Sequence, residues 1–141
     1  MQLRTRIQSP SGFLGSLGEL VQEGIVAVRK RQQNPGVISG VTSETLFLPT
    51  AFEVFGVGNS TVRNPNETTA NQFQYQYFAR GGKSSSRNDY AVKEFNGVAG
   101  GYWTRSVANG SPDHFVVVST HTVNWGNTTN TGCGFVPLFC F

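Results

Sequence analysis

Hydrophobic and polar residues alternate most regularly in the last third of the chain. Successive side chains of a strand point to opposite faces, so this alternation predicts short strands. Four are predicted, over residues 91–95, 102–106, 113–120 and 134–141. Asn109-Gly110 is a turn signal between the second and the third. The Asn- and Thr-rich stretch 126–132 is predicted to be the loop before the last strand.

The first ninety residues combine one alternating stretch with two helix starts. Residues 2–7 show the period-two pattern of an edge or half-buried strand. The stretches 16–19 and 50–53 have the spacing of a capping box, in which a hydroxyl and a carboxylate satisfy opposing backbone N–H groups. They predict one helix that ends at Gly24 and another that ends at Gly56.

Shorter elements are expected between these, on the evidence of apolar runs and of Gly, Pro and Ser clusters. Further strands are predicted over residues 25–28, 46–49 and 75–78, and loops over 32–43, 57–71 and 81–88. The chain has no repeat of fixed period and no linker long enough to separate two domains. A single domain over residues 1–141 is therefore expected.

Composition narrows the class of protein. Charged residues make up only 13% of the 141 residues, about half the roughly 25% of ordinary soluble domains. The polar surface must therefore consist of Asn, Gln, Ser and Thr, as on many extracellular and virion proteins. Seventeen Gly favour many turns and short strands, whereas 11 Phe supply a core.

The distribution of charge argues against nucleic-acid binding. The net charge is +3, but Lys and Arg are spread along the chain and none follows Arg105. A nucleic-acid reader concentrates them on one element beside aromatic residues. A solvated or subunit-facing basic patch is expected instead. No run of apolar residues approaches the length of a membrane span, and residues 1–10 lack the apolar stretch of a signal peptide.

Three stretches of the chain match a known pattern. LFLPTAFEVFG (46–56), GGYWTRS (100–106) and GFVPLFCF (134–141) occur in the order of a family signature. The chain resembles a family of poorly characterised bacterial and phage domains with the C-type-lectin fold. That family is related to retroelement-diversified variable proteins and to formylglycine-generating enzymes. The likeness covers residues 46–141 well and residues 1–45 only loosely.

The resemblance implies an α+β, C-type-lectin-like fold of mostly short antiparallel strands, one or two short helices and long loops. Such domains close by pairing their first and last strands, and here only residues 2–7 remain for the first. Either the chain is a truncated variant or a neighbouring subunit completes the sheet, so a homo-oligomer is expected. Four residues are expected to be structural, with Trp103 in the core and Arg105 bonded to loop carbonyls: Glu53, Trp103, Arg105 and Pro137.

The resemblance also implies a binding surface made of loops. In diversified relatives the variable positions lie between the Trp-x-Arg-Ser strand and the closing strand. The matching candidates here are His121, Asn124, Trp125, Asn127, Thr128 and Asn130. Amides and hydroxyls beside an indole bind sugars or proteins. The alternative, a polar turn with Trp125 in the core, stays open. Loops 107–112 and 121–132 are the expected contact surface.

Metal and catalytic chemistry find little support. A calcium site wants several carboxylates, and Asp113 is the only acid after Arg105. Cys133 and Cys140 match the paired C-terminal cysteines of the copper-dependent formylglycine-generating enzymes. Their odd separation would point them to opposite faces of one regular strand, and buried free thiols are commoner. No HExxH or Gly-x-Ser-x-Gly pattern occurs. No cofactor, no metal and no catalytic residue is therefore expected.

The sequence thus predicts a non-enzymatic display or binding module of a phage virion or bacterial surface, which recognises a host-surface protein or glycan. The alternative is a structural virion subunit, a capsid decoration or tail component, that contacts other subunits through its basic amino-terminal third. A copper-thiolate oxidase of the formylglycine-generating type is a minor alternative.

Overall fold

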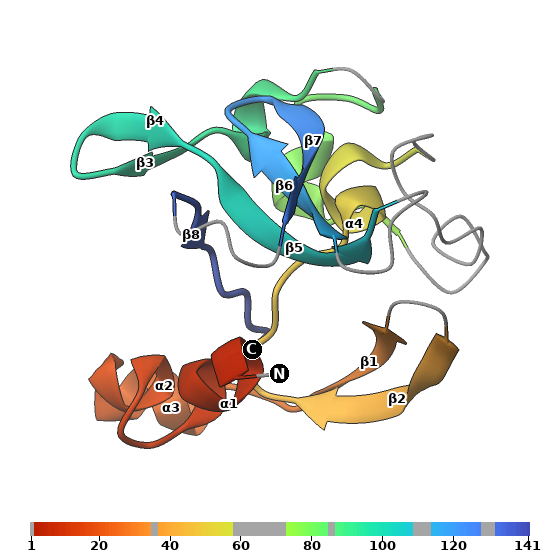
Figure 1. Cartoon of the computed structure of the whole chain (residues 1–141). Helices are drawn as coiled ribbons and strands as arrows, with labels where there is room; N and C mark the ends of the chain where they lie inside the picture. Colours follow the sequence, from red (N-terminus) through yellow and green to blue (C-terminus); the bar gives the residue numbers. More distant parts are fainter. Residues whose placement is uncertain (1, 35–36, 58–72, 85–86, 109–113, 128–131) are drawn as a thin grey trace.

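The protein has an α+β architecture with short helices and mostly antiparallel strands. The computed structural model describes residues 2–34, 37–57, 73–84, 87–108, 114–127 and 132–141. Figure 1 shows a lower lobe of three helices and a hairpin, and an upper lobe around the central sheet. The segment after β2 and the carboxy-terminal segment both run between the lobes, and the two chain ends lie close together (Figure 1).

The lower lobe begins with a helix where a strand was predicted. Its elements are α1 (Gln2–Gln8), α2 (Phe13–Ser16), α3 (Glu19–Gly24), β1 (Val28–Asn34) and β2 (Val37–Glu44). The prediction of a strand over residues 2–7 is wrong. Leu3 and Ile7 are also four positions apart, a spacing that fits one side of a helix. Ile7 is buried, and the side-chain amide of Gln8 donates to the carbonyl of Leu46 (3.1 Å). These contacts decide between the two patterns.

Two further predictions for the lower lobe are wrong. Within the predicted loop 32–43, residues 32–34 belong to β1 and 37–43 to β2, and the two strands pair from Val28 opposite Glu44 to Asn34 opposite Val37. The stretch 16–19 does not form a capping box either. Helix α3 starts after Gly18 without a side-chain cap, and the Ser16 hydroxyl donates back to the carbonyl of Phe13 (2.6 Å). The predicted end of this helix at Gly24 is confirmed.

The second predicted helix is confirmed as α4 (Ala51–Phe55). The Thr50 hydroxyl accepts from the Glu53 amide (3.1 Å), and the Glu53 carboxylate accepts from the Thr50 amide (2.8 Å). Gly56 ends the helix with φ 71°, a left-handed conformation that favours glycine over other residues. The capping box and the glycine therefore fix both ends of a one-turn helix.

The aromatic segment 75–78 is a helix, not the predicted strand. Helix α5 (Gln76–Ala79) buries Phe78 and leaves Tyr77 exposed, and the one-turn 3₁₀ helix η2 (Asp89–Ala91) follows it in the chain. The loop predicted over residues 81–88 ends on a buried side chain, that of Asn88. Residues 58–72, 85–86 and 109–113 lie outside the described part, and with them most of the predicted loop 57–71 and the Asn109-Gly110 turn.

The central sheet has four strands in the order β7-β6-β5-β8. Their bounds are β5 (Tyr102–Val107), β6 (His114–Ser119), β7 (Thr122–Asn127) and β8 (Gly134–Phe135). Strands β5, β6 and β7 are antiparallel, whereas β8 pairs parallel to β5. A separate hairpin joins β3 (Lys93–Phe95) to β4 (Val98–Gly100). The strands predicted over 91–95, 102–106 and 113–120 are confirmed with small shifts, whereas β4 and β7 were missed.

The final eight residues connect the two lobes. Only Gly134–Phe135 is a regular strand; farther along, Leu138 forms a bridge with Phe47 and Cys140 forms one with Val26. The Leu138 and Phe47 amides each donate to the other's carbonyl (2.8 and 3.0 Å). The last segment therefore pairs with Val26 and Phe47, and not with residues 2–7 as expected. Pro137, partly buried, lies between its two pairing regions.

The core lies where the sheet meets the short helices. Its main cluster consists of Val54, Phe55, Phe78, Ala91, Tyr102 and Val118. The expectation that Trp103 is a core residue is wrong, since it is only partly buried. Strand β5 instead buries Tyr102, Thr104 and Ser106. The face of the strand that carries these residues, and not the face that carries Trp103, is therefore turned toward the core. In the described part of the chain, no helix has both the length and the apolar character that crossing a membrane requires.

Candidate functional site

The six predicted ligand-binding residues do not form one loop. His121 lies in the tight turn between β6 and β7, whereas Asn124, Trp125 and Asn127 belong to β7 itself. Asn124 is exposed, and Trp125 pairs with Val116 of the neighbouring strand. Thr128 and Asn130 lie outside the described residues. Residues 121–127 are thus a turn and an edge strand.

The register of β6 and β7 separates these residues into two regions. Ser119 pairs with Thr122 at one end of the ladder, and His114 pairs with Asn127 at the other. The five residue steps between Thr122 and Asn127 correspond to about 17 Å at the usual strand rise of about 3.3 Å per residue. His121 therefore lies at the opposite end of the sheet from Asn127. Strands β5 and β7 both end at the Asn127 end of the sheet. The expected contact loops 107–112 and 121–132 were predicted to follow or include these strand ends.

The His121 end of the sheet is held against the short helices by Asn88. The Asn88 backbone amide donates to the carbonyl of His121 (2.9 Å). Its buried side-chain amide donates to the carbonyls of Val54 (2.9 Å) and Phe78 (3.0 Å) and accepts from the amide of Tyr90 (3.0 Å). Asn88 thus fixes α4, α5 and η2 relative to one another through its side chain, and the β6–β7 turn through its backbone amide.

Two exposed tyrosines lie beside this junction. Tyr77 on α5 and Tyr90 on η2 meet edge to face, with ring centroids 5.9 Å apart and planes at 84°. The residues are 51% and 39% exposed. The Lys93 ammonium lies 4.4 Å from the Tyr77 ring centroid and donates to the Tyr77 hydroxyl (3.1 Å) and the Tyr90 carbonyl (3.3 Å). We call Tyr77, Tyr90 and Lys93 the tyrosine surface.

Sequence reasoning missed the tyrosine surface because its members come from separate elements. Tyr77 was assigned to a strand with Tyr75 and Phe78, and Tyr90 belonged to no predicted element. No local periodicity links Tyr77 to Tyr90. Tertiary contacts, such as those of Asn88 with Phe78 and Tyr90, bring the two segments together.

A second polar cluster, the Glu53 network, is buried between the lobes. The Glu53 carboxylate forms ion pairs with Arg105 (2.7 Å) and Lys30 (3.0 Å). The side chains of the three are 6%, 13% and 12% exposed, in that order. The Tyr75 hydroxyl also donates to this carboxylate (3.3 Å) and contacts the Lys30 ammonium. The ammonium lies over the rings of Phe47 (4.1 Å) and Tyr75 (4.7 Å).

The electrostatics of the network favour an ionised Glu53 and a neutral Tyr75. Burial alone would raise the pKa of the Glu53 carboxyl. The charges of Arg105 and Lys30, together with the bonds from Arg105 and from the Thr50 amide, outweigh burial and lower the pKa below its ordinary 4.5. Burial and the neighbouring carboxylate raise the pKa of Tyr75 far above 10. A phenol that stays protonated can donate to the carboxylate throughout the physiological range.

The Glu53 network ties together elements that are distant in sequence. Lys30 belongs to β1, Glu53 to α4 and Arg105 to β5, so the cluster joins the lower hairpin to the central sheet. Arg105 is expected from the sequence to bond loop carbonyls; the structure shows in addition that its side chain pairs with the buried carboxylate of Glu53. A planar guanidinium suits a carboxylate better than a point charge does. The Glu53 network therefore holds the lower lobe and the upper lobe together.

The two cysteines are free thiols, each partly buried. Cys140 pairs with Val26 through its backbone, whereas Cys133 precedes β8 and lies beside Gly101. Burial raises the pKa of Cys133. Metal ligands and nucleophiles need the thiolate, so this shift works against copper binding at neutral pH. Among the described residues, no three His, Cys, Asp or Glu side chains converge on a position for a metal ion.

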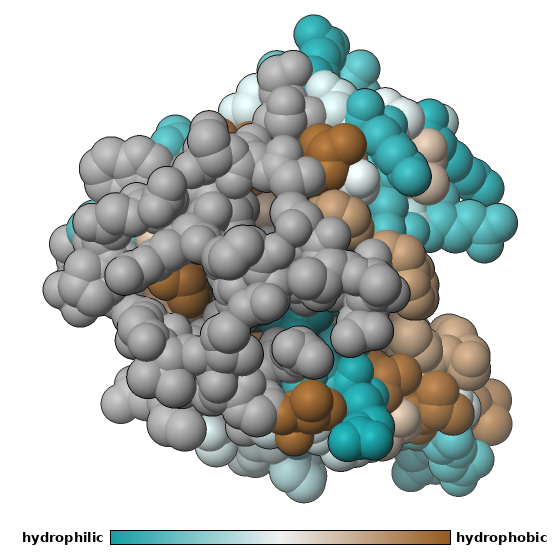
Figure 2. Space-filling model, turned by 90° about the vertical axis from the view of Figure 1, so that its right-hand side faces the viewer, coloured by the Kyte–Doolittle hydropathy of each residue, from teal (hydrophilic) through white to brown (hydrophobic). Residues whose placement is uncertain are grey.

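Large hydrophobic side chains reach the surface in several places. The most exposed are Leu20, Phe73, Val98 and Phe141. Figure 2 shows, on one side of the molecule, hydrophobic residues gathered below a strongly hydrophilic upper part. The four residues come from different elements of both lobes. Scattered exposure of this kind is normal and does not by itself mark a binding site.

The comparison with known families gives one result. Residues 10–141 match the family described as a domain of unknown function, DUF6273. The chain belongs to the DUF6273 family. No curated protein and no solved structure matches it significantly. The tyrosine surface and the Glu53 network both lie within the DUF6273 region, whereas all of α1 precedes it.

Proposed function

We propose that this DUF6273 domain is a non-enzymatic binding module with a C-type-lectin-like fold, displayed on a phage virion or bacterial surface. Its ligand is a host-surface protein or glycan. The observation that carries the proposal is the tyrosine surface, where two exposed rings are held at a right angle beside a cation. Tyrosine rings stack on the apolar faces of sugars and offer proteins a large contact area with few rotatable bonds.

The tyrosine surface is prearranged for contact. Lys93 bonds the hydroxyl of one tyrosine and the backbone of the other, and Asn88 fixes the backbone under Tyr90. Side chains that are already ordered lose little conformational entropy when a partner binds. The rim carries an exposed Arg87–Asp89 ion pair (2.8 Å), which adds polar groups for hydrogen bonding. An aromatic centre with a polar rim is the usual composition of a recognition surface.

The two regions at the ends of the sheet favour a large ligand. We place a first contact at the tyrosine surface and His121, and a second at Asn124, Trp125 and Asn127 with the loops beyond. The roughly 17 Å along β7 from Thr122, the neighbour of His121, to Asn127 exceeds the size of one sugar ring. A protein or an oligosaccharide would be needed to touch both regions.

The C-type-lectin-like part of the proposal rests on the order of three elements. The capped helix α4, the strand β5 with Tyr-Trp-x-Arg-Ser and the closing segment follow one another as in the family that the chain resembles. The closing segment pairs both with β5 and with upstream residues. This arrangement supports a closed fold that presents its connections to a ligand.

The test is to remove each ring separately. We expect Tyr77→Ala and Tyr90→Ala each to weaken adsorption of the purified domain to host cells, and binding to a glycan array, by roughly thirtyfold. That factor corresponds to a central aromatic residue worth about 2 kcal/mol. Phe73→Ala is the matched control, because it removes an exposed ring that packs on Tyr75 and is not a member of the tyrosine surface. Unchanged binding by both tyrosine variants, or an equal loss for Phe73→Ala, would contradict the proposal.

The second candidate is a structural virion subunit. Leu20 and Phe141 favour it, because both are strongly exposed on the lower lobe and the Phe141 ring lies beside Gly24, one helical turn after Leu20 on α3. Neighbouring apolar residues of this kind can be covered by another subunit. Trp125→Ala and Asn127→Ala separate the two functions. Lost host adsorption with intact particles supports binding, whereas failed assembly of a normally folded chain supports architecture. Stoichiometric copper uptake that Cys133→Ser abolishes would instead support the oxidase.

A further inference from the structure

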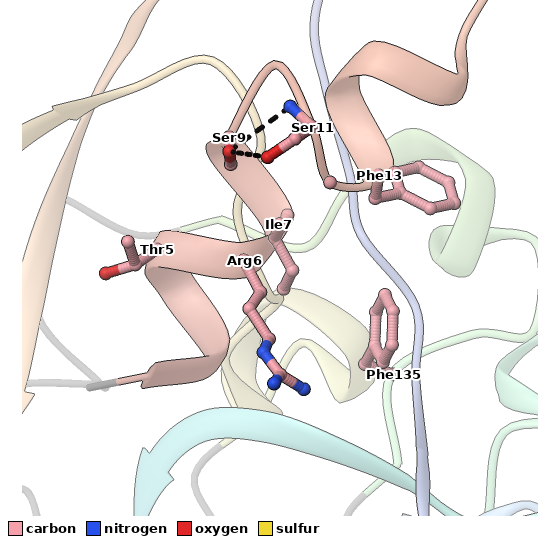
Figure 3. A pocket seen from close by; sticks show the side chains of 8 residues that line it. Thr5, Arg6, Ile7, Ser9, Ser11, Phe13 and Phe135 are labelled. Carbon is pink, nitrogen blue, oxygen red and sulfur yellow. Dashed lines mark hydrogen bonds between the residues drawn. The ribbon is translucent and has the colours of Figure 1, made fainter.

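A pocket lies between the amino-terminal helices and β8. It is lined by Thr5, Arg6, Ile7, Ser9, Ser11, Gly12, Phe13 and Phe135. Its volume of about 510 Å³ falls within the range of roughly 300–1,000 Å³ that ligand pockets occupy. Figure 3 shows Arg6 extending from α1 toward the β8 side, where Phe135 rises toward Phe13. Ser9 and Ser11 lie at the corner between the helices (Figure 3).

The corner that forms one wall of the pocket is tightly folded. The Gly12 amide donates to the carbonyl of Ser9 (2.8 Å). Any side chain at Gly12 would collide with the backbone carbonyl of Arg6, so only glycine allows this close approach. Ile7 is buried and so packs α1 against the rest of the protein. The backbone that carries Arg6 and the two serines is therefore well fixed.

The charge in the pocket is a single cation. Arg6 is exposed and forms no ion pair with another described residue. Its guanidinium offers five N–H donors in a planar fork, which matches the two oxygens of a carboxylate. Phe13 and Phe135 meet edge to face with centroids 6.1 Å apart, and Phe135 is partly exposed. An anion bound at Arg6 would thus have an aromatic wall beside it.

The serine pair adds one hydrogen-bond donor. The hydroxyls of Ser9 and Ser11 share a hydrogen bond (2.9 Å), and the Ser11 amide donates to the Ser9 hydroxyl (3.2 Å). Two hydroxyls carry two protons, and the shared bond uses one of them. The second proton remains for a ligand at the edge of the pocket.

We infer that this pocket binds a small molecule that carries a carboxylate on a flat, mostly apolar body. Arg6 takes the carboxylate in a two-pronged hydrogen bond, Phe13 and Phe135 contact the body, and the free serine proton bonds a second polar atom. The inference is independent of the proposed function, because no residue of the tyrosine surface lines the pocket. It also gives the residues that precede the DUF6273 region a role of their own.

The experiment uses the full chain and a matched series of probes. Benzoate, phenylacetate and 3-phenylpropionate are titrated by calorimetry and by NMR, each beside its neutral amide, with acetate as the anion that lacks an apolar body. Arg6→Gln removes the proposed carboxylate partner. Arg29→Gln removes an equal charge from another exposed arginine and is the matched control.

At least one aromatic carboxylate is expected to bind saturably, and its amide and acetate at least about tenfold more weakly. Arg6→Gln should cost a similar factor, as for a charge-assisted hydrogen bond, while Arg29→Gln leaves binding unchanged. Resonances of Phe13 and Phe135 should shift with the same saturation curve. No saturable binding of any carboxylate would overturn the inference. So would equal binding of acid and amide, or equal losses in the two arginine variants.

Discussion

Replacing Glu53 by Gln is the sharpest perturbation of the Glu53 network. The substitution keeps the length of the side chain and an oxygen that can accept from the Thr50 amide, so the start of α4 is retained. It removes the negative charge that faces both Arg105 and Lys30. The two cations are then left close together, largely buried and without the carboxylate that balances them.

The expected loss of stability follows from that burial. The Arg105 and Lys30 side chains are only 13% and 12% exposed, so water does little to screen them. Removal of one partner from a buried ion pair costs about 3–5 kcal/mol, because a charge is left uncompensated. Lys30 keeps its contacts with the rings of Phe47 and Tyr75, which places the expectation near the lower end of that range. We expect Glu53→Gln to lower the free energy of unfolding by about 3 kcal/mol.

Urea denaturation followed by circular dichroism measures this loss. Asp89→Asn is the matched control, since it removes a carboxylate whose partner Arg87 is exposed, and it should cost less than about 1 kcal/mol. A loss below about 1 kcal/mol for Glu53→Gln would refute the argument that the network fastens the lobes together. A loss equal to that of Asp89→Asn would do the same.

The same carboxyl predicts a dependence of stability on pH. The folded-state pKa of Glu53 lies below the unfolded value of 4.5, so its contribution is complete above about pH 4.5. The contribution is lost as the pH falls from there through the folded-state pKa. In Glu53→Gln this part of the acid destabilisation should be missing. Parallel pH profiles for the two proteins between neutral pH and the acid transition would contradict the assignment.

Three further substitutions test the core and the closing segment. Tyr102→Phe removes a buried hydroxyl that has no hydrogen-bond partner among the described residues. The substitution should raise the free energy of unfolding by up to about 1 kcal/mol, and a lower free energy of unfolding would contradict this reasoning. Asn88→Ala removes one of the donors to the Val54 and Phe78 carbonyls, which also accept from Gln74, and it removes the acceptor of the Tyr90 amide. It should cost about 2 kcal/mol in urea, and a loss under about 1 kcal/mol would contradict its joining role. Deletion of residues 138–141 removes both closing bridges and should expose the lower lobe to limited proteolysis, whereas an unchanged digestion pattern would contradict that role.

Local signals in the sequence predicted the elements whose causes are themselves local. The capping box at 50–53 and the stop at Gly56 need only neighbouring residues, and both are confirmed. The alternation in β5 and β6 likewise marked strands correctly. The alternation did not reveal which face of β5 is buried, because that depends on which other elements pack against the strand. The inward face turned out to carry Tyr102 and not Trp103.

Elements that depend on distant partners were not predictable in this way. Residues 32–43 look like a loop by composition, yet 32–34 belong to β1 and 37–43 belong to β2, and these two strands pair in a hairpin. Residues 2–7 fit both a strand and a helix, and burial of Ile7 with the bond from Gln8 to Leu46 favours the helix. Strand β7 was not predicted, because its Asn and Thr residues suggested a loop.

The candidate site was predicted only in part. His121, Asn124, Trp125 and Asn127 were singled out together, but the β6–β7 register places His121 at one end and Asn127 at the other. The tyrosine surface and the pocket around Arg6 each join segments that are far apart in the sequence. Glu53 and Arg105 were named as structural residues without any sign that they pair, because they are 52 positions apart in the sequence.

Hydrogen–deuterium exchange of the full chain, free and bound to envelopes of host cells, tests the binding proposal most directly. We expect slower exchange of the amides around Tyr77, Tyr90 and His121 in the bound state. Slower exchange confined to the lower lobe, or no change at these three positions, would contradict a role for the tyrosine surface in recognition.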